Sequence, residues 1–395
     1  MSTPPPTETI PLARPDIGPE EEAEVLEVLR SGVLGLGPRA QDFERLAAEF
    51  VGARWGVAMS SGTGGLHAVV RALGIGAGDC VPMSSFSFIA AANAVHYEGA
   101  QPVFIDIDPD TLCLSSERLG TYLESCVRRG NDLIDPGTGL RVAAVMTTDI
   151  FGHPQKLDDV LAHVAHHGLP IIADACEALG SRYRTDAGEW VHAGSGAAAT
   201  VVAFYPNKQI TTGEGGMVLG DEPAMLVQLQ ALRNQGREAG DAWLRHSQIG
   251  FNYRLDELSA ALGLVQMRRI DEILGRRSAV VAHYNDALAD LEVGCPRAAE
   301  WADPSWFVYF LRVGRDRDRD AIVAAVNERG IASKAYFDIP IHRQPPYAGL
   351  AELVPEPLPN TEAAAADILI LPFFSTMTAD QVGRVADTVK EVLKA

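Results

Sequence analysis

Residues 204–216 have the sequence FYPNKQITTGEGG, and they follow a mostly apolar run, Ala199 to Phe204, that predicts a buried strand. A proline turn, a single lysine, two threonines and a glycine-rich turn come after that strand. Lys208 therefore stands at a strand exit among apolar and turn residues, where loss of hydration disfavours the ammonium form. A neutral amine can attack an aldehyde and form a Schiff base. The ordinary alternative is an exposed lysine in a turn. Other parts of the sequence are needed to choose between a Schiff-base lysine and an exposed one.

The composition is that of a large globular protein. With 395 residues, the chain is long enough for a large core and two domains. An apolar content of 47% and a charged content of 22% are ordinary for a soluble protein. The formal net charge of -19 argues against nucleic acid or an anionic membrane surface as a partner. A small anionic substrate stays possible, because a local site can be basic within an acidic whole.

The five cysteines are widely spaced and form no CxxC motif, which favours a reduced, cytoplasmic protein over a disulfide framework or a zinc site. No apolar run approaches about 18 residues, so no membrane span is expected. Residues 1–9 are predicted to form a flexible tail, because they are rich in proline and threonine and lack the features of a signal peptide. Three histidines have the spacing of one helix face, namely His163, His166 and His167. No carboxylate or cysteine completes a set of metal ligands with them, so no metal site is predicted.

Strand-like and helix-like segments alternate along the first part of the chain. Short, largely apolar strands predict a mostly parallel sheet buried on both faces, and hence an α/β fold. The pattern changes after Gly250, so we expect a large domain over residues 10–254 and a smaller α+β domain over residues 255–395. The predicted strands are 55–59, 81–84, 103–106, 142–146, 170–174, 199–204 and 306–313; the predicted helices are 20–30, 41–50, 64–73, 89–97, 115–126, 157–166, a long interrupted helix 255–289, 320–329 and 379–393.

Ligands of open α/β sheets bind outside the carboxyl ends of the strands, and a phosphate-binding pattern falls at one such end. Residues 60–65, SSGTGG, form a strand-to-helix turn whose small residues allow the backbone to approach a phosphate. The hydroxyl groups and the free N–H groups of the helix N-terminus supply donors. Simple capping of the helix by Ser61 or Thr63 explains the same residues equally well.

Three further residues at strand ends complete a pattern. Phe88, in the segment FSF of residues 86–88, is able to lie flat on a planar ring, although a core phenylalanine is the commoner case. Asp174 follows a strand, where it either pairs with a protonated pyridine nitrogen or caps a helix. Lys208 lies one strand further on. An anion cradle, an aromatic ring, a carboxylate and a Schiff-base lysine in this order match one cofactor, pyridoxal 5'-phosphate.

Three more motifs connect the chain to a known family: GLGP at residues 35–38, GFNYR at 250–254 and PIHRQP at 340–345. With them, the chain from about Ile10 to near the C-terminus resembles the DegT/DnrJ/EryC1/StrS family of pyridoxal-phosphate-dependent sugar aminotransferases, which have fold type I. The resemblance implies that Lys208 forms the Schiff base and moves a proton between substrate and cofactor. It also implies that Asp174 holds the pyridine nitrogen, that Phe88 stacks on the ring, and that Gly62 and Thr63 bind the phosphate.

The resemblance further implies a homodimer with shared active sites, because Asn252 would reach the cofactor phosphate of the neighbouring subunit. Arg254 has the spacing to lie on the same side as Asn252 if the segment is extended, and a structural ion pair is equally expected for it. Tyr336 and His342 are candidates for the sugar pocket.

Two positions depart from the family pattern. Ala203 stands where many members have a phosphate-binding serine, so one phosphate contact is expected to be absent or replaced. Glu177 stands where many members have glutamine or histidine opposite the cofactor's O3' oxygen. Two anionic oxygens cannot lie together without a proton between them. Either one of the two oxygens is protonated, or Glu177 points elsewhere.

The expected reaction is transfer of an amino group from L-glutamate or glutamine to a keto group of a nucleotide-linked sugar, for amino-sugar biosynthesis. An aminotransferase acting on a free keto-cyclitol is the alternative among enzymes. A regulatory protein that binds the cofactor without turnover is the alternative from another class, and the presence of both Lys208 and Asp174 argues against it.

Overall fold

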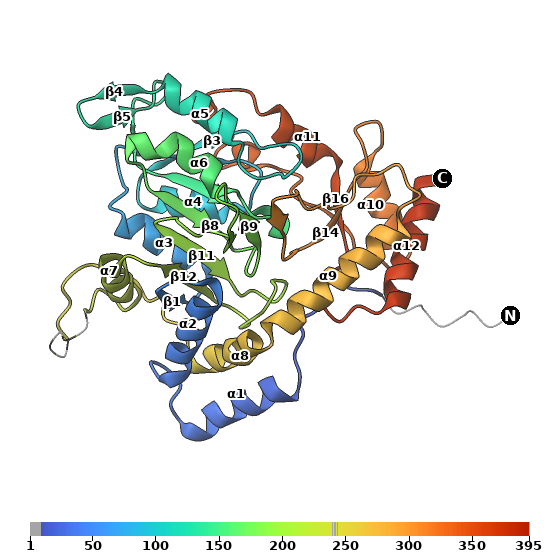
Figure 1. Ribbon diagram of the computed structural model, residues 1–395, viewed down its shortest axis with the longest axis horizontal. Coiled ribbons are helices and arrows are strands. Elements are labelled where there is room, and N and C mark those ends of the chain that lie inside the picture. Colours follow the sequence, from blue (N-terminus) through green and yellow to red (C-terminus); the bar gives the residue numbers. More distant parts are fainter. Residues whose placement is uncertain (1–8, 239, 241, 243, 395) are drawn as a thin grey trace.

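A large mixed sheet, mostly parallel, lies at the centre of the computed structural model, which describes residues 9–238, 240, 242 and 244–394 (Figure 1). Residues 1–8 of the predicted tail lie outside the described residues. The strand order is β1-β12-β11-β8-β7-β2-β6-β5-β4, and β3 also pairs with β2. The strands are β1 (Trp55–Met59), β2 (Asp79–Ser84), β3 (Gln101–Ile105), β4 (Val127–Arg129), β5 (Asp132–Ile134), β6 (Arg141–Val142), β7 (Val145–Thr148), β8 (Ile171–Asp174), β11 (Ala199–Ala203) and β12 (Gly216–Gly220).

The strand directions bring the expected strand ends to one edge of the sheet. Strands β2, β3, β6, β7, β8 and β11 are joined by parallel pairs. Strand β12 is antiparallel to both β1 and β11, so β1 runs in the same direction as β11. No sequence pattern predicted β12 or the β4–β5 hairpin. The predicted α/β class with a mostly parallel sheet is confirmed.

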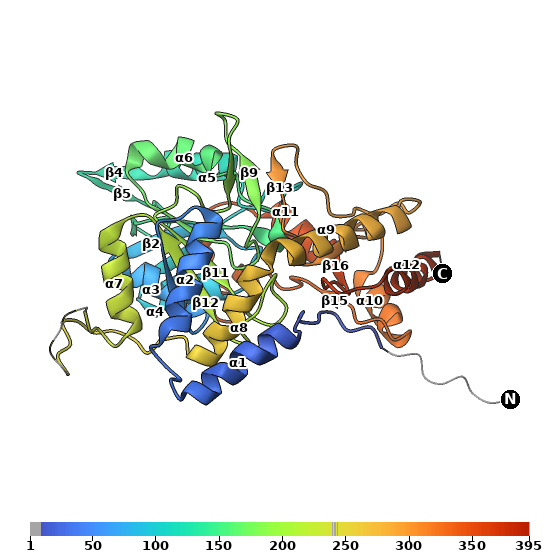
Figure 2. The same cartoon turned by 60° about the horizontal axis from the view of Figure 1, so that its bottom comes forward.

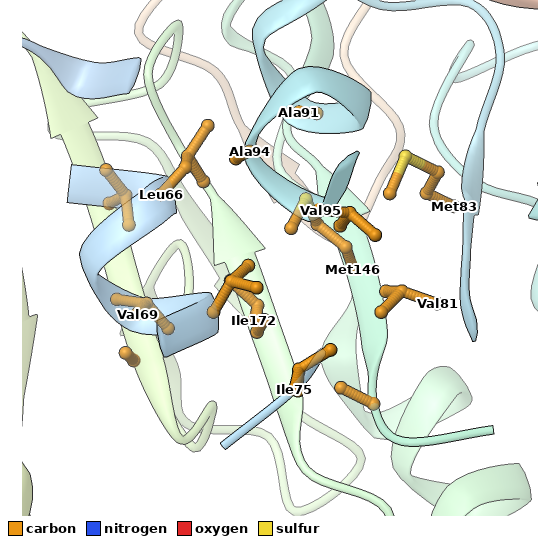
Figure 3. Close-up of a cluster of buried hydrophobic side chains, with 14 of the residues drawn as sticks. Leu66, Val69, Ile75, Val81, Met83, Ala91, Ala94, Val95, Met146 and Ile172 are labelled. Atoms are coloured by element: carbon orange, nitrogen blue, oxygen red, sulfur yellow. The ribbon is translucent and has the colours of Figure 1, made fainter. Parts of the chain in front are cut away.

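Helices cover both faces of this sheet, because neighbouring residues of a buried strand point to opposite sides. Val201 belongs to the core beneath α3 (Gly62–Ala72), α4 (Ala90–Tyr97) and α7 (Pro223–Arg233). Figure 3 shows part of this core, where side chains of α3 and α4 meet those of the strands. Val202 belongs instead to the core shared with α2 (Pro38–Val51) and α8 (Glu257–Arg268). Helices α5 (Ser116–Ser125) and α6 (Leu157–Val164) cover the other half of that second face.

The C-terminal part has a core of its own around a three-stranded antiparallel sheet, β14-β16-β15. Its strands are β14 (Tyr309–Arg312), β15 (Lys334–Ala335) and β16 (Ile368–Leu371), and its helices are α9 (Ile270–Ala287), α10 (Arg319–Glu328), α11 (Pro359–Asp367) and α12 (Ala379–Lys394). The break expected in the long helix lies at Arg269, between α8 and α9. The apolar side chains of α8 pack with α2, whereas Val280 and Val281 of α9 pack in the C-terminal core. The division at residue 255 stays a prediction.

The remaining elements lie around these two cores (Figure 2). Helix α1 runs beside α8, and a second three-stranded sheet has the order β10-β9-β13. Within the described ranges, no helix combines the length and the apolar content needed to cross a membrane. These elements are α1 (Pro19–Ser31), β9 (Arg182–Arg184), β10 (Trp190–His192), β13 (Ala302–Asp303) and the 3₁₀ turns η1 (Ile150–Gly152), η2 (Ala165–His167), η3 (Ile341–Arg343) and η4 (Ala351–Leu353).

Asp106 joins the central sheet to the C-terminal part. It lies directly after β3 and is 2% exposed. Its Oδ1 atom accepts hydrogen bonds from the backbone N–H and the hydroxyl of Thr361, at 2.8 and 2.9 Å, and Oδ2 accepts from the N–H of Asn360 at 3.0 Å. These donors belong to the first turn of α11, whose N–H groups have no partner within the helix. One buried carboxylate therefore anchors α11 to the sheet.

We predict that Asp106→Ala lowers the free energy of unfolding by about 3 kcal/mol, because it leaves buried donors without a partner. Asp318→Ala is the matched control: Asp318 caps α10 by accepting from the N–H groups of Asp320 and Ala321, but it is exposed. Loss of that cap costs about 1 kcal/mol, since water replaces it. Urea denaturation of the full-length chain measures both. Equal shifts of the two midpoints would contradict the anchoring role of Asp106.

Candidate active site

A cavity of about 330 Å³ lies at the edge of the sheet where β1, β7, β8 and β11 end and β12 begins. Residues from six separate chain segments meet in its wall, and those predicted at strand ends are among them. The predicted site residues that line it are Gly62, Thr63, Phe88, Asp174, Glu177, Lys208 and Tyr336. Asn252, Arg254 and His342 are not part of this wall.

The start of α3 forms one wall of the cavity. Ser61 is the N-cap, and its hydroxyl accepts from the N–H of Gly64 at 3.0 Å. The first-turn N–H groups of Gly62 and Thr63 have no intrahelical partner and remain available to an anion. A Cβ added to Gly62 would lie 2.8 Å from Ala203 Cβ and 2.9 Å from Cys176 Sγ. Glycine at position 62 therefore permits the close approach of α3 to β11.

Asp174 ends β8 and is 6% exposed. Its Oδ1 atom accepts from the N–H of Cys176 at 3.1 Å. Burial raises the pKa of the carboxyl group, and the hydrogen bonds from Cys176 and the charge of Lys208 oppose that shift. A buried carboxyl group of this kind gains most from a partner that carries a proton, such as a protonated ring nitrogen.

A second buried aspartate lies on the neighbouring strand end. The backbone N–H of Asp149 donates to the backbone oxygen of Asp174 at 3.0 Å, and its Oδ1 accepts from the N–H of Gln155 at 2.6 Å. Burial raises the pKa of Asp149 to about 7, and the charge of Asp174 adds to that shift. Asp149 does not line the cavity. No pattern in the sequence predicted it, because its position depends on the pairing of β7 with β8.

Lys208 lies in the connection between β11 and β12, which hydrogen bonds hold in shape. The N–H of Phe204 donates to Gly215, and both the N–H of Thr212 and the hydroxyl of Thr211 donate to the carbonyl of Phe204. This closed loop directs the lysine side chain, which is 13% exposed, into the cavity.

Glu177 points toward Lys208. The lysine Nζ atom is 3.5 Å from Oε1 of Glu177, and the N–H of Phe151 donates to Oε2 at 3.0 Å. Burial raises the pKa of Glu177, and the charge of Lys208 opposes the shift. Lys208 Nζ also lies 3.9 Å from the ring centroid of Phe307. The sequence predicts a strand that includes Phe307 but not this contact, which only the packing of the C-terminal part against the sheet creates.

Two of the predicted site residues in the cavity wall are aromatic, and they lie in different environments. Phe88 is 58% exposed, so its ring is available to a ligand. Tyr336 stacks on Phe151, with ring centroids 5.8 Å apart and an interplanar angle of 13°. Burial raises the pKa of Tyr336, and the nearby Glu177 adds to the shift. Tyr336 therefore presents a neutral hydroxyl group near the carboxyl group.

The other three predicted residues lie elsewhere. Asn252 is exposed and forms a backbone bridge with Asn234. Arg254 donates to the side-chain oxygen of Asn234 at 3.1 Å, which is a hydrogen bond to a neutral amide and not the ion pair expected as its alternative. His342 forms hydrogen bonds with Ser85 Oγ at 2.7 Å and Glu362 Oε1 at 2.8 Å. The role of Asn252 concerns a second subunit and stays a prediction, as do the substrate roles of Arg254 and His342.

The residues of the cavity fit pyridoxal 5'-phosphate. The start of α3, with glycine at position 62, offers N–H groups to its phosphate. The buried carboxyl group of Asp174 fits its ring nitrogen, and the amine of Lys208 fits its aldehyde. In addition, the Oδ1 atom of Asn207 is buried at the cavity without a partner in the described part of the chain, as a group that awaits a ligand would be. When bound, this cofactor supplies an aldehyde that takes up amines and a ring that withdraws electrons.

Comparison with known proteins gives consistent matches along almost the whole chain. A model of the DegT/DnrJ/EryC1/StrS aminotransferase family matches residues 15–390. A GDP-perosamine synthase from Caulobacter vibrioides is 33% identical over 389 residues, which are 97% of this chain and 98% of that protein.

Solved structures show the same fold. DesV from S. venezuelae has a TM-score of 0.86 at 32% identity, covering 98% of this chain and 100% of that one. DesI, solved in the presence of its TDP-sugar product, has a TM-score of 0.84 at 29% identity, covering 98% and 93%. An aminotransferase from Brucella abortus has a TM-score of 0.85 at 26% identity, covering 94% and 95%. The chain therefore belongs to the DegT/DnrJ/EryC1/StrS aminotransferase family, and its cofactor is pyridoxal 5'-phosphate.

Proposed function

We propose that this protein transfers an amino group from L-glutamate, or from glutamine, to a keto group of a nucleotide-linked sugar. The observation that carries the proposal is the convergence of Lys208, Asp174 and the start of α3 on one cavity. The nucleotide sugar is supported by the relatives, one of which is named a GDP-perosamine synthase and another of which was solved with a TDP-sugar product.

Each residue of the cavity has a distinct task in this proposal. Lys208 binds the cofactor and carries the proton that moves during transfer. Asp174 keeps the ring nitrogen protonated, because a buried carboxylate is stabilised by a cation beside it. Gly62 and Thr63 hold the phosphate through their N–H groups. Phe88 covers the ring from the open side, where its exposed side chain lies.

The size of the cavity limits what else it holds. Binding pockets for small ligands range from about 300 to 1,000 Å³, and this cavity, at about 330 Å³, is at the lower end. It suits the cofactor and the reacting end of a substrate, whereas a nucleotide needs further surface at the mouth. Phe88 and Tyr205, 58% and 51% exposed, lie at that mouth and are suited to contact the substrate or a second subunit.

We also propose that the protein is a cytoplasmic homodimer with shared sites. Several large apolar side chains are exposed in segments that adjoin the cavity or the Asn252 segment: Leu36 (63%), Phe88 (58%), Tyr97 (56%), Tyr205 (51%) and Ile249 (78%). Exposure of this kind is typical of a surface that a partner covers, and a twofold interface lets one surface complete its own copy. All five cysteines are free thiols, which supports a reducing compartment.

The substrate proposal predicts that the protein aminates at least one member of a panel of nucleotide-linked keto sugars when L-glutamate is supplied. The product is detected by mass spectrometry as a sugar nucleotide that has exchanged a keto oxygen for an amino group. Lys208→Ala is the control and should form no product. Amination of a free keto-cyclitol, with none of the nucleotide sugars converted, would replace the proposal by the cyclitol alternative.

The role of Asp174 predicts that Asp174→Asn binds the cofactor but reacts with L-glutamate on the order of 10²-fold more slowly, because the ring nitrogen loses its proton. The rate is followed by the change in cofactor absorbance in a single turnover. Asp149→Asn is the matched control, since Asp149 is equally buried and lies outside the cavity wall. Below its pKa of about 7, the Asp149 carboxyl group is protonated and asparagine is a close mimic. Similar losses of rate in both variants would mean that the burial of Asp174, and not a contact with the ring nitrogen of the cofactor, matters for the reaction.

The shared-site proposal predicts that two inactive variants restore activity when mixed. Lys208→Ala removes the amine, and Asn252→Asp places a negative charge where the proposal puts the partner's phosphate, which makes the homodimer inactive. In a mixed dimer, one site carries both changes and the other carries neither, so up to half of the wild-type activity per mixed dimer should return.

Differently tagged chains show whether mixed dimers form, and each variant refolded with itself is the control. If mixed dimers form and stay inactive while Asn252→Asp alone is inactive, Asn252 acts within its own subunit and the shared-site arrangement is excluded.

A further inference from the structure

The amine of Lys208 lies between two groups that both attract a cation. Its Nζ atom is 3.5 Å from Oε1 of Glu177 and 3.9 Å from the ring centroid of Phe307. A cation within about 6 Å of an aromatic face is attracted by the ring, and a carboxylate adds a charge of opposite sign. Glu177 and Phe307 are 5% and 2% exposed, so water screens neither attraction strongly.

The Phe307 ring is held in place through its backbone. Arg277 of α9 donates from Nε to the oxygen of Trp306 at 2.9 Å and from Nη2 to the oxygen of Phe307 at 2.8 Å. The N–H of Phe307 donates to the oxygen of Phe151 at 2.8 Å. A Cβ added to Gly152 would lie 2.7 Å from the nitrogen of Phe307, so glycine at 152 permits this close approach.

The same short segment also positions Glu177. The N–H of Phe151 donates to Oε2 of Glu177, and this leaves Oε1 to face Lys208. The Nε2 atom of Gln209 donates to the backbone oxygen of Glu177, which fixes the carboxyl-bearing residue from the lysine loop itself. Phe151 thus links the carboxylate and the aromatic ring on either side of one amine.

We propose that Glu177 and Phe307 form a docking site that holds the Lys208 ammonium group inside the cavity whenever the amine is not covalently bound to the cofactor. This rests on the proposed role of Lys208. An aminotransferase releases its lysine from the cofactor in the first half-reaction and binds it to the cofactor again at the end of the second. An amine that stays docked keeps its position beside the cofactor, instead of moving into solvent between the two events.

The other ionisable groups around the amine do not offer the same contacts. Asp174 is sensitive to the charge of Lys208, but its place in the cavity suits the ring nitrogen. Cys176 and Tyr336 are held neutral, because burial raises the pKa of both. Glu177 is therefore the carboxylate that faces the amine, and Phe307 is the aromatic ring that covers it.

The test measures how fast acetic anhydride acylates Lys208 in the full-length protein loaded with pyridoxamine 5'-phosphate, the form in which no covalent bond holds the lysine. Mass spectrometry gives the extent of acylation at Lys208 relative to that at Lys334, which is exposed on β15. Because only a neutral amine is acylated, a docked ammonium group reacts slowly. Glu177→Gln and Phe307→Leu should each raise the relative rate about five-fold or more.

Three comparisons separate docking from loss of packing. Phe310→Leu replaces an aromatic ring in the same apolar cluster as Phe307 and should leave the acylation rate of Lys208 unchanged. Phe307→Tyr keeps the aromatic face and should react like the wild type. Glu177→Gln keeps the shape of the side chain and its acceptor for the Phe151 N–H, so a faster rate reports the charge alone. Where a variant binds pyridoxamine 5'-phosphate poorly, the cofactor-free full-length chain gives the same comparison.

The docking site is excluded if Phe307→Leu accelerates acylation no more than Phe310→Leu, or if Glu177→Gln leaves the rate unchanged. Borohydride reduction of the wild-type protein with pyridoxal 5'-phosphate distinguishes a wrong docking site from a wrong proposed function. If the cofactor is trapped on Lys208 and the acylation rates do not change, only the docking site is wrong. If the cofactor is trapped on another lysine, the assignment of Lys208 itself is wrong.

Discussion

Burial of three ionisable groups, Asp174, Glu177 and Lys208, at one edge of the central sheet is the constraint on which the site depends. Charges removed from water are costly unless each has a partner. Here Lys208 lies beside Glu177, while Asp174 has one protein donor and faces the cavity. In the described part of the chain, no cation forms an ion pair with the buried carboxyl group of Asp174. A protonated ring nitrogen beside Asp174, as we propose, would supply that cation.

Two glycines allow the chain segments around these charges to pack closely. Gly62 allows α3 to approach β11 closely, and Gly152 allows the segment of Trp306 and Phe307 to approach η1. Each glycine lies where a side chain would collide with another part of the chain. Through these two contacts, the start of α3 reaches the cavity, and a segment of the C-terminal part reaches the lysine. The geometry of the site thus depends on packing between elements that are far apart in the sequence.

The C-terminal part contributes to the site as well as to stability. Arg277 is 3% exposed and donates to two carbonyl groups without an acidic partner in the described contacts, and desolvation lowers its pKa to about 9. Burying an unpaired guanidinium group is costly, and the gain is a fixed position for Phe307. Tyr336, which also comes from this part, closes the cavity from another side. Relative movement of the two parts would therefore alter the surroundings of the lysine directly.

The sequence by itself determined the α/β class, most of the strands and helices, and the residues Lys208, Asp174, Gly62 and Thr63 at strand ends. Periodicity reports which residues are buried, and parallel strands place their carboxyl ends together. It could not decide where Glu177 points or which ring lies against Lys208. The tertiary structure decided these points, because they depend on contacts between Phe151, Gly152 and Phe307, which no local pattern encodes. The tertiary structure also places Asp149 next to Asp174, because the pairing of β7 with β8 brings together two residues that are far apart in the sequence.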